Sequence, residues 1–153
     1  MNNLNIINEQ KYKLQYSSIL LDIFNQVMIA ENIIKKTELN LIIINKEQML
    51  DLQKKYRDKD YVTDILSFPF DYDVHEEELG YILLGDIYIC FEKIIEQAKE
   101  YDHTEKREWS YLFCHGIYHL LGYDHIKRKE KKAMNSKVSQ IMCKINVDRK
   151  QKC

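Results

Sequence analysis

A chain of 153 residues with 45% hydrophobic and 31% charged side chains has the composition of a globular protein that can bury a sizeable core. Its net charge of −1 excludes a global basic field, so any anionic partner must be held by a local patch. The apolar runs are too short and interrupted to span a membrane, and the polar residues 1–10 do not resemble a signal peptide. We therefore expect one domain, residues 1–153, without membrane contact.

The cysteines are scattered and form no C-x-x-C pair or small disulfide framework. This pattern is typical of reduced thiols in a cytoplasmic protein, so we expect a cytoplasmic location. The four positions are Cys90, Cys114, Cys143 and Cys153.

In chain order, hydrophobic periodicity and turn residues predict a short strand, an amphipathic helix, a buried strand and a helix capped by Asn45. Their expected ranges are Leu4–Asn8, Tyr16–Ile34, Leu39–Ile44 and Asn45 to about Tyr56.

The second half begins with a predicted strand that Pro69 ends, a position suited to a sheet edge. An acidic hairpin loop, a strand buried on both faces and three helices follow. This order of elements predicts an α+β fold, a small mixed β-sheet of about four strands flanked by helices. The ranges are Thr63–Phe70, Asp71–Leu79, Tyr81–Cys90, Glu92–Tyr101, Thr104–Leu121 and Lys127–Ile145.

Three of the five histidines follow an H-x3-H-x5-H spacing. Chance would produce about 0.005 such spacings in a chain of this composition. His115 and His119 lie four residues apart, on one face of a helix, and Gly122 can end that helix in a left-handed conformation. The turn then lets His125 return toward the pair. Three nitrogens suit a tetrahedral Zn²⁺ with one position left for water.

The spacing is that of metzincin proteases, except that Gly116 stands where they have their glutamate general base. Peptide hydrolysis by the usual route is therefore not supported. The plainer alternative is a pair of satisfied core histidines. The apolar stripe of the helix runs beside them, which favours the edge of a cleft. We expect the neighbouring Cys114 to be a buried thiol and not a ligand.

A basic segment with two tyrosines precedes the predicted edge strand. Arginine offers a planar fork of donors to phosphate, and tyrosines can stack on bases. A solvated helix end that complements the helix dipole is the simpler reading. The residues are Lys54, Lys55, Tyr56, Arg57, Lys59 and Tyr61.

Together these segments resemble the YbeY family of bacterial metal-dependent endoribonucleases of rRNA maturation. The resemblance rests on H-G-x-x-H-L-L-G-Y-D-H, on Leu84-Gly85-Asp86-Ile87, and on Y-R-x-K-D-x-x-T-D-x-L-S-F-P before them. It runs in order from about Leu39 to Met142.

The resemblance implies one zinc ion at His115, His119 and His125, with Arg57 facing the metal across a cleft. It further implies action on single-stranded RNA in 16S rRNA 3′-end processing and ribosome quality control. The ribosome or its small subunit is then a partner, and no DNA is expected. In this family the fold is a small sheet flanked by helices.

Six positions depart from the family pattern, and none of them removes a ligand. Gln53 in place of asparagine could shift a hydrogen bond near Arg57. The others are Asp58 for glycine, Val62 for proline, Cys90 for serine, Cys114 for valine and Tyr118 for leucine.

The chemistry that fits is metal-assisted phosphodiester hydrolysis, in which Zn²⁺ acidifies a water and Arg57 holds the phosphate. The general base stays open. Asp124 can orient a histidine or stabilise a turn, and the nucleophile can be a water or the substrate's 2′-OH. Two other classes remain: a non-catalytic ribosome-assembly factor with a metal-stabilised fold, and a metalloprotease-like hydrolase.

We expect Asp64 and Asp86 to cap helices or make buried hydrogen bonds rather than to catalyse. His75 and His103 match no ligand pattern. The basic cluster at 127–132 is either a solvated helix face or a set of additional phosphate contacts.

Overall fold

A four-stranded sheet forms the centre of the computed structural model, which describes residues 2–70, 79–123 and 128–145. The strand order is β1-β2-β4-β3; β1 and β2 are parallel, β2 and β4 are parallel, and β3 is antiparallel to β4. The predicted α+β fold with a mixed sheet is confirmed. The elements are β1 Asn3–Asn8, α1 Ser17–Ala30, β2 Thr37–Ile44, α2 Lys46–Arg57, β3 Ile65–Pro69, β4 Ile82–Cys90, α4 Phe91–Glu100, α5 Glu105–Leu120 and α6 Arg128–Ile145.

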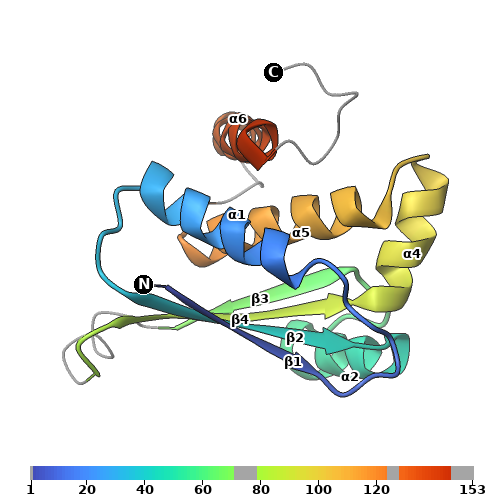
Figure 1. Cartoon of the computed structure of the whole chain (residues 1–153). Coiled ribbons are helices and arrows are strands. Elements are labelled where there is room, and N and C mark those ends of the chain that lie inside the picture. Colours follow the sequence, from blue (N-terminus) through green and yellow to red (C-terminus); the bar gives the residue numbers. More distant parts are fainter. Residues whose placement is uncertain (1, 71–78, 124–127, 146–153) are drawn as a thin grey trace.

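The helices lie in layers (Figure 1). Helices α1 and α5 cover one face of the sheet, α6 crosses over both of them on the outside, and α2 lies against one end of the opposite face. No described helix combines the length and the apolar character that crossing a membrane requires.

The main core lies between the sheet and helices α1 and α5. Trp109, Phe113 and Ile117 on α5 are fully buried against strand residues such as Ile87. Each such side chain contributes about 1.5–3 kcal/mol through its removal from water. Met134 on α6 closes the outer side, so α5 is buried both toward the sheet and toward α6.

The end of the first helix and both ends of strand β3 differ from the prediction. The first helix ends at Ala30 and not near Ile34, because Asn32 is left-handed at φ 58° and the Ile33 amide donates back to the Met28 carbonyl at 2.9 Å. Strand β3 is shorter than Thr63–Phe70, but Pro69 does lie on an outermost strand as predicted. The predicted acidic loop lies outside the described residues except for Leu79.

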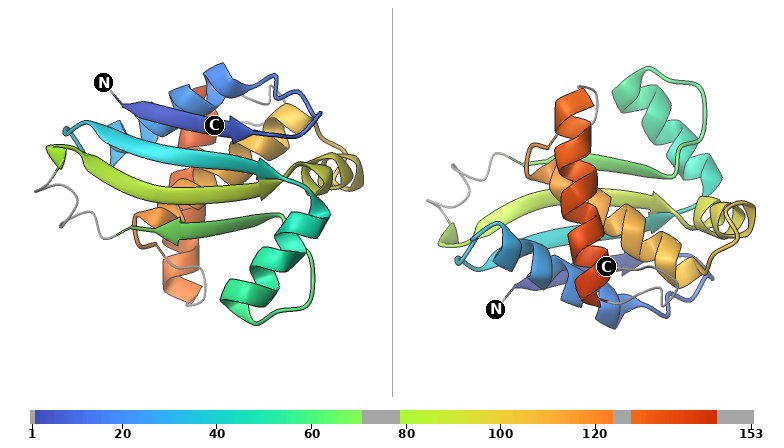
Figure 2. Two further views of the ribbon diagram at one scale, coloured as in Figure 1. Left: turned by 90° about the horizontal axis from the view of Figure 1, so that it is seen from below. Right: turned by 90° about the horizontal axis from the view of Figure 1, so that it is seen from above.

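The prediction that strand β4 is buried on both faces holds only toward its carboxyl end. There Ile89 enters the main core, and Cys90 enters a small core beneath α2 with Met49. Asp86 and Tyr88 are half-buried instead, because α2 covers only one end of that face (Figure 2, left).

The cap predicted for α2 is confirmed. The Asn45 side chain accepts from the Gln48 amide at 2.9 Å, and the Gln48 side chain accepts from the Asn45 amide at 3.0 Å. At the other end, Asp58 is left-handed at φ 52°. The helix therefore stops directly after Arg57.

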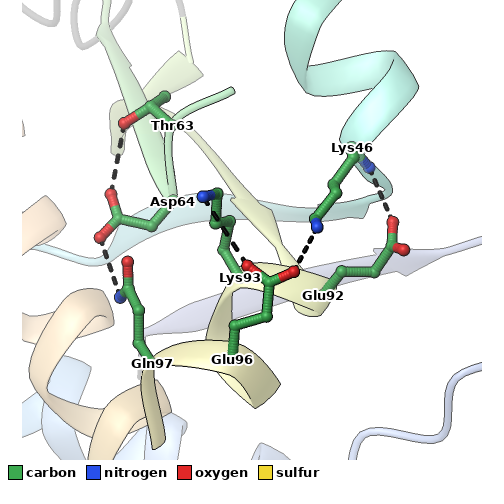
Figure 3. A network of polar contacts seen from close by, with 7 residues as sticks. All are labelled: Lys46, Thr63, Asp64, Glu92, Lys93, Glu96 and Gln97. Carbon is green, nitrogen blue, oxygen red and sulfur yellow. Dashed lines mark hydrogen bonds and ion pairs between the residues drawn. The ribbon is translucent and has the colours of Figure 1, made fainter. Parts of the chain in front are cut away.

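A polar network joins α2, the start of β3 and α4 (Figure 3). The Lys46 amide donates to Glu92 at 2.9 Å, and its side chain pairs with Glu96. Gln97 donates to the Asp64 carboxylate at 3.2 Å. The structural hydrogen bonding predicted for Asp64 is thus confirmed, and it ties α4 to the edge strand.

Strand β4 contains one extra residue, Leu84, where its register against β2 shifts. The next residue, Gly85, has φ 154°, and an ideal Cβ there would overlap the Phe68 carbonyl oxygen and lie 2.9 Å from Leu120 Cδ2. A glycine is therefore required where β3, β4 and the end of α5 meet.

Gly85→Ala should lower the free energy of unfolding by about 2–4 kcal/mol, because the clash with backbone adds to conformational strain. Gly80→Ala is the matched control, since Gly80 is also left-handed at φ 74° but has open space around it. It should cost about 1 kcal/mol. Urea denaturation measures both, and equal losses would contradict the packing explanation.

Candidate functional site

Helix α5 carries the first two predicted ligands. Its cap, Thr104, accepts from the Arg107 amide at 3.1 Å. His115 and His119 are half-buried beside the apolar face of the helix, as the stripe predicted. Cys114 is fully buried, and its burial raises the pKa of its thiol. Its complete burial among core side chains supports its assignment as a core thiol.

Gly116 faces the sheet. A Cβ at this position would lie 2.8 Å from Ile65 Cδ1, 3.1 Å from Ile87 Cδ1 and 3.4 Å from Ser67 Oγ. Helix α5 therefore lies close against β3 and β4. A glutamate here would point between these strands, which argues structurally against a metzincin-like base.

The two helical histidines point at one another. Their Nε2 atoms are 3.1 Å apart and their ring centroids 4.8 Å apart. Two nitrogens bound at ~2.0–2.1 Å to one tetrahedral Zn²⁺ would be about 3.3–3.4 Å apart. The pair therefore fits a shared ion with only a small adjustment.

The third predicted ligand, His125, lies outside the described residues, as does Asp124. Within the described part of the chain, no group of three His, Cys, Asp or Glu side chains gathers around a point where a metal could bind. The three-histidine set therefore stays a prediction.

The turn after α5 is as predicted, with Gly122 left-handed at φ 97°. Tyr123 is anchored there by a contact that the sequence did not indicate. Its hydroxyl donates to the Glu31 carboxylate at 2.5 Å, and Lys137 donates to the other Glu31 oxygen at 3.0 Å. The bond to Glu31 raises the pKa of Tyr123. The residue that ends α1 and helix α6 thereby fix the chain two residues before His125.

Arg57 approaches the same region from the other face of the sheet. It is exposed, its Nη2 donates to the Ser67 carbonyl at 3.1 Å, and its guanidinium carbon lies 4.9 Å from the centre of the Phe68 ring. Because Ser67 Oγ faces Gly116, Arg57 and the histidine helix meet at one residue of the edge strand. The guanidinium has five donors, so several remain for phosphate.

The other residues singled out in the sequence make structural hydrogen bonds or lie exposed on a helix. Asp86 accepts from Asn40 at 2.9 Å, as its predicted hydrogen-bonding role requires. Gln53 is buried, and its backbone carbonyl accepts from the Lys59 amide at 3.1 Å. Its predicted influence on Arg57 stays a prediction. The basic residues at 128–132 are exposed on α6, whereas residue 127 and His75 lie outside the described residues.

His103 has a partner that the sequence analysis missed. Its Nε2 lies 3.1 Å from Glu108 Oε2, and Glu108 is buried. The sequence did carry one indication of this contact, because Glu108 is an acidic residue in the first turn after the Thr104 cap. The contact with His103 accounts for the burial of the Glu108 carboxylate, so no catalytic role is needed to explain it.

The chain is similar over nearly its whole length to proteins of one family. The family described as Endoribonuclease YbeY matches residues 4–146. Proteins named Endoribonuclease YbeY from Mycoplasma mobile and Mycoplasmopsis pulmonis are 41% and 38% identical; the matches cover 97% of this chain in each case, and 98% and 100% of the relatives. The chain therefore belongs to the endoribonuclease YbeY family.

A solution structure of a Thermotoga maritima protein is similar with a TM-score of 0.60 and 24% identity. The match covers 98% of this chain and 96% of that one. At this identity the likeness concerns the fold alone, and it agrees with the mixed sheet and its helices.

Tyr123→Phe should lower the free energy of unfolding by about 1.5–3 kcal/mol, because it removes a hydrogen bond to a largely buried carboxylate. Tyr101→Phe is the matched control, since Tyr101 is 59% exposed and should change stability by less than about 0.5 kcal/mol. Urea denaturation of the metal-free protein compares the two. Equal small effects would show that the Glu31 contact does not hold the turn.

Proposed function

We propose that this protein is a zinc-dependent endoribonuclease that hydrolyses phosphodiester bonds in single-stranded RNA. The observation that carries the proposal is the pair of imidazole nitrogens on α5, 3.1 Å apart, close to where Arg57 reaches the edge strand. Membership of a family described as an endoribonuclease supports RNA as the substrate.

His115 and His119, with His125, would hold one Zn²⁺. When bound, the ion supplies a Lewis acid and lowers the pKa of water at the site. The described residues do the positioning. Helix α5 presents both Nε2 atoms to one point, and the Tyr123–Glu31 contact fixes the chain that leads to His125.

Arg57 would hold the scissile phosphate. A guanidinium gives parallel hydrogen bonds to two phosphate oxygens, and it offsets charge that develops on them in the transition state. Its bond to the Ser67 carbonyl holds the side chain against the strand. Gly116 supplies no general base, so the proton of the nucleophile must leave by another route. The two candidate nucleophiles are a water molecule and the 2′-OH of the substrate.

The family resemblance supports a cellular role, and the scattered cysteines support a cytoplasmic location. We propose that the substrate is 16S rRNA near its 3′ end, with the small ribosomal subunit as partner and ribosome quality control as the setting, in the cytoplasm. The exposed basic residues at 128–132 on α6 would add contacts to phosphates, and RNA binding should then weaken steeply with salt.

Zinc should stabilise the protein. At a free Zn²⁺ concentration of about 100 times the Kd, the gain in the free energy of unfolding is about 2.7 kcal/mol, and thermal unfolding with and without Zn²⁺ measures it. His115→Gln should lose most of this gain. His103→Gln should keep it, because His103 pairs with Glu108 instead. No gain in the parent protein would contradict a zinc site.

Arg57→Ala should lower kcat for a single-stranded RNA oligonucleotide by about 10²- to 10³-fold with unchanged zinc content. Lys54→Ala is the matched control, because Lys54 is in the same helical turn and pairs with Asp60 at 3.5 Å. It should lose less than about threefold through its charge alone. Full activity of Arg57→Ala would remove Arg57 from the mechanism.

A further inference from the structure

A pocket of about 230 Å³ lies on the sheet face opposite the histidines, next to Arg57. Pockets that enclose drug-sized ligands measure ~300–1,000 Å³, so this one suits a single planar group. Its lining combines three aromatic rings, one aliphatic side chain and one carboxylate. The residues are Leu52, Tyr56, Phe68, Asp86 and Tyr88.

The aromatic rings meet edge to face. The ring centroids of Tyr56 and Phe68 are 5.5 Å apart, and those of Phe68 and Tyr88 are 5.7 Å apart. Tyr56 is 54% exposed, so its ring is open to stacking by a ligand. Aromatic side chains beside positively charged groups commonly hold the bases of single-stranded nucleic acid by stacking.

Asp86 brings the one negative charge to this pocket, and a row of amides holds it in place. Asn5 donates to Asn40 at 3.0 Å, and Asn40 donates to Asp86 Oδ1 at 2.9 Å. The direction of the last bond is certain because a carboxylate only accepts. Within the described part of the chain, no further hydrogen bond to the Asp86 side chain is found, so Oδ2 can still accept from a ligand.

The charges around the pocket favour a base inside it and a phosphate outside it. Arg57 lies over the Phe68 ring, and Lys55 lies 5.2 Å from the centre of the Tyr56 ring. These cations suit a phosphate outside the pocket. A carboxylate inside it repels phosphate and accepts from a base edge that carries donors. Guanine offers two such donors on one edge, N1–H and N2–H₂, whereas adenine presents an acceptor at N1.

We propose that this pocket binds one base of the RNA, with a preference for guanine, at the nucleotide whose phosphate Arg57 holds. The proposal rests on the proposed endoribonuclease function and adds sequence preference to it. The single strand then crosses the exposed edge of β3, with its base on the face near α2. Helix α5, which carries the histidines, covers the opposite face of the sheet (Figure 2).

The test uses zinc-loaded protein and fluorescein-labelled 2′-O-methyl oligouridine octamers with one central guanosine or adenosine, checked for integrity on a gel. Fluorescence anisotropy gives the Kd. The parent protein should bind the guanosine octamer about 5- to 10-fold more tightly than the adenosine octamer. Asp86→Asn should reduce this ratio below about twofold, since one carboxylate oxygen becomes a donor.

Glu38→Gln is the matched control for Asp86→Asn. Glu38 lies on the same strand as Asn40 and accepts from Asn3 at 2.8 Å, but it does not line the pocket. It also removes one negative charge, so it should shift both affinities together and keep the ratio. Equal ratios in the two variants, or no preference in the parent protein, would overturn the proposal.

Tyr56→Ala tests the stacking surface at a position that is 54% exposed. It should weaken binding of both octamers at least about fivefold, and unchanged affinity would count against the pocket. Cleavage of unmodified RNA is measured in parallel. Binding and cleavage without base preference would overturn the pocket alone, whereas absence of both would overturn the proposed function as well.

Discussion

The close approach of helix α5 to strands β3 and β4 is the constraint on which the rest of the structure depends. It occurs at Gly116, where any side chain would meet Ile65 and Ile87. The flanking turns of the helix bury Phe113 and Ile117 completely. The helix can neither rotate nor lift without exposing this surface, so His115 and His119 stay at the margin of the sheet.

The edge strand β3 contacts helix α5 on one face of the sheet and Arg57 and the pocket on the other face. An outermost strand presents unpaired backbone groups, and one of them, the Ser67 carbonyl, accepts from Arg57. The neighbouring Phe68 faces the other way, toward Asp86 and Tyr88. Side chains alternate along β3, so Ser67 faces the histidine helix while Phe68 lines the pocket on the opposite face. A single extended chain that crosses this strand can therefore approach the histidines, Arg57 and the pocket.

Local patterns predicted much of this arrangement. The histidine spacing located the candidate ligands, the Asn45 capping box fixed the start of α2, and the glycine after α5 gave the turn. Each depends on residues within a few positions of one another. The end of α1 was missed because apolar residues continue the helical period to Ile34 while Asn32 turns the backbone.

Long-range contacts were beyond such patterns. Glu31 and Tyr123 are 92 positions apart, and Glu31 and Lys137 are 106 apart. The pocket likewise draws on α2, β3 and β4, and its side chains share a surface only because of the strand order. Asp86 could be predicted as a hydrogen-bonding residue. Its position beside three aromatic rings could not, since that required the register of Phe68 with Asp86.

The most direct test of the central claim is cleavage of a single-stranded oligonucleotide that carries an rRNA 3′ end, by zinc-loaded protein and by His119→Ala, with the metal content of both determined. We expect cleavage by the parent protein and loss of both metal and cleavage in the variant. Equal residual cleavage by the two proteins would contradict a metalloribonuclease. It would instead favour a ribosome-assembly factor in which the metal only stabilises the fold.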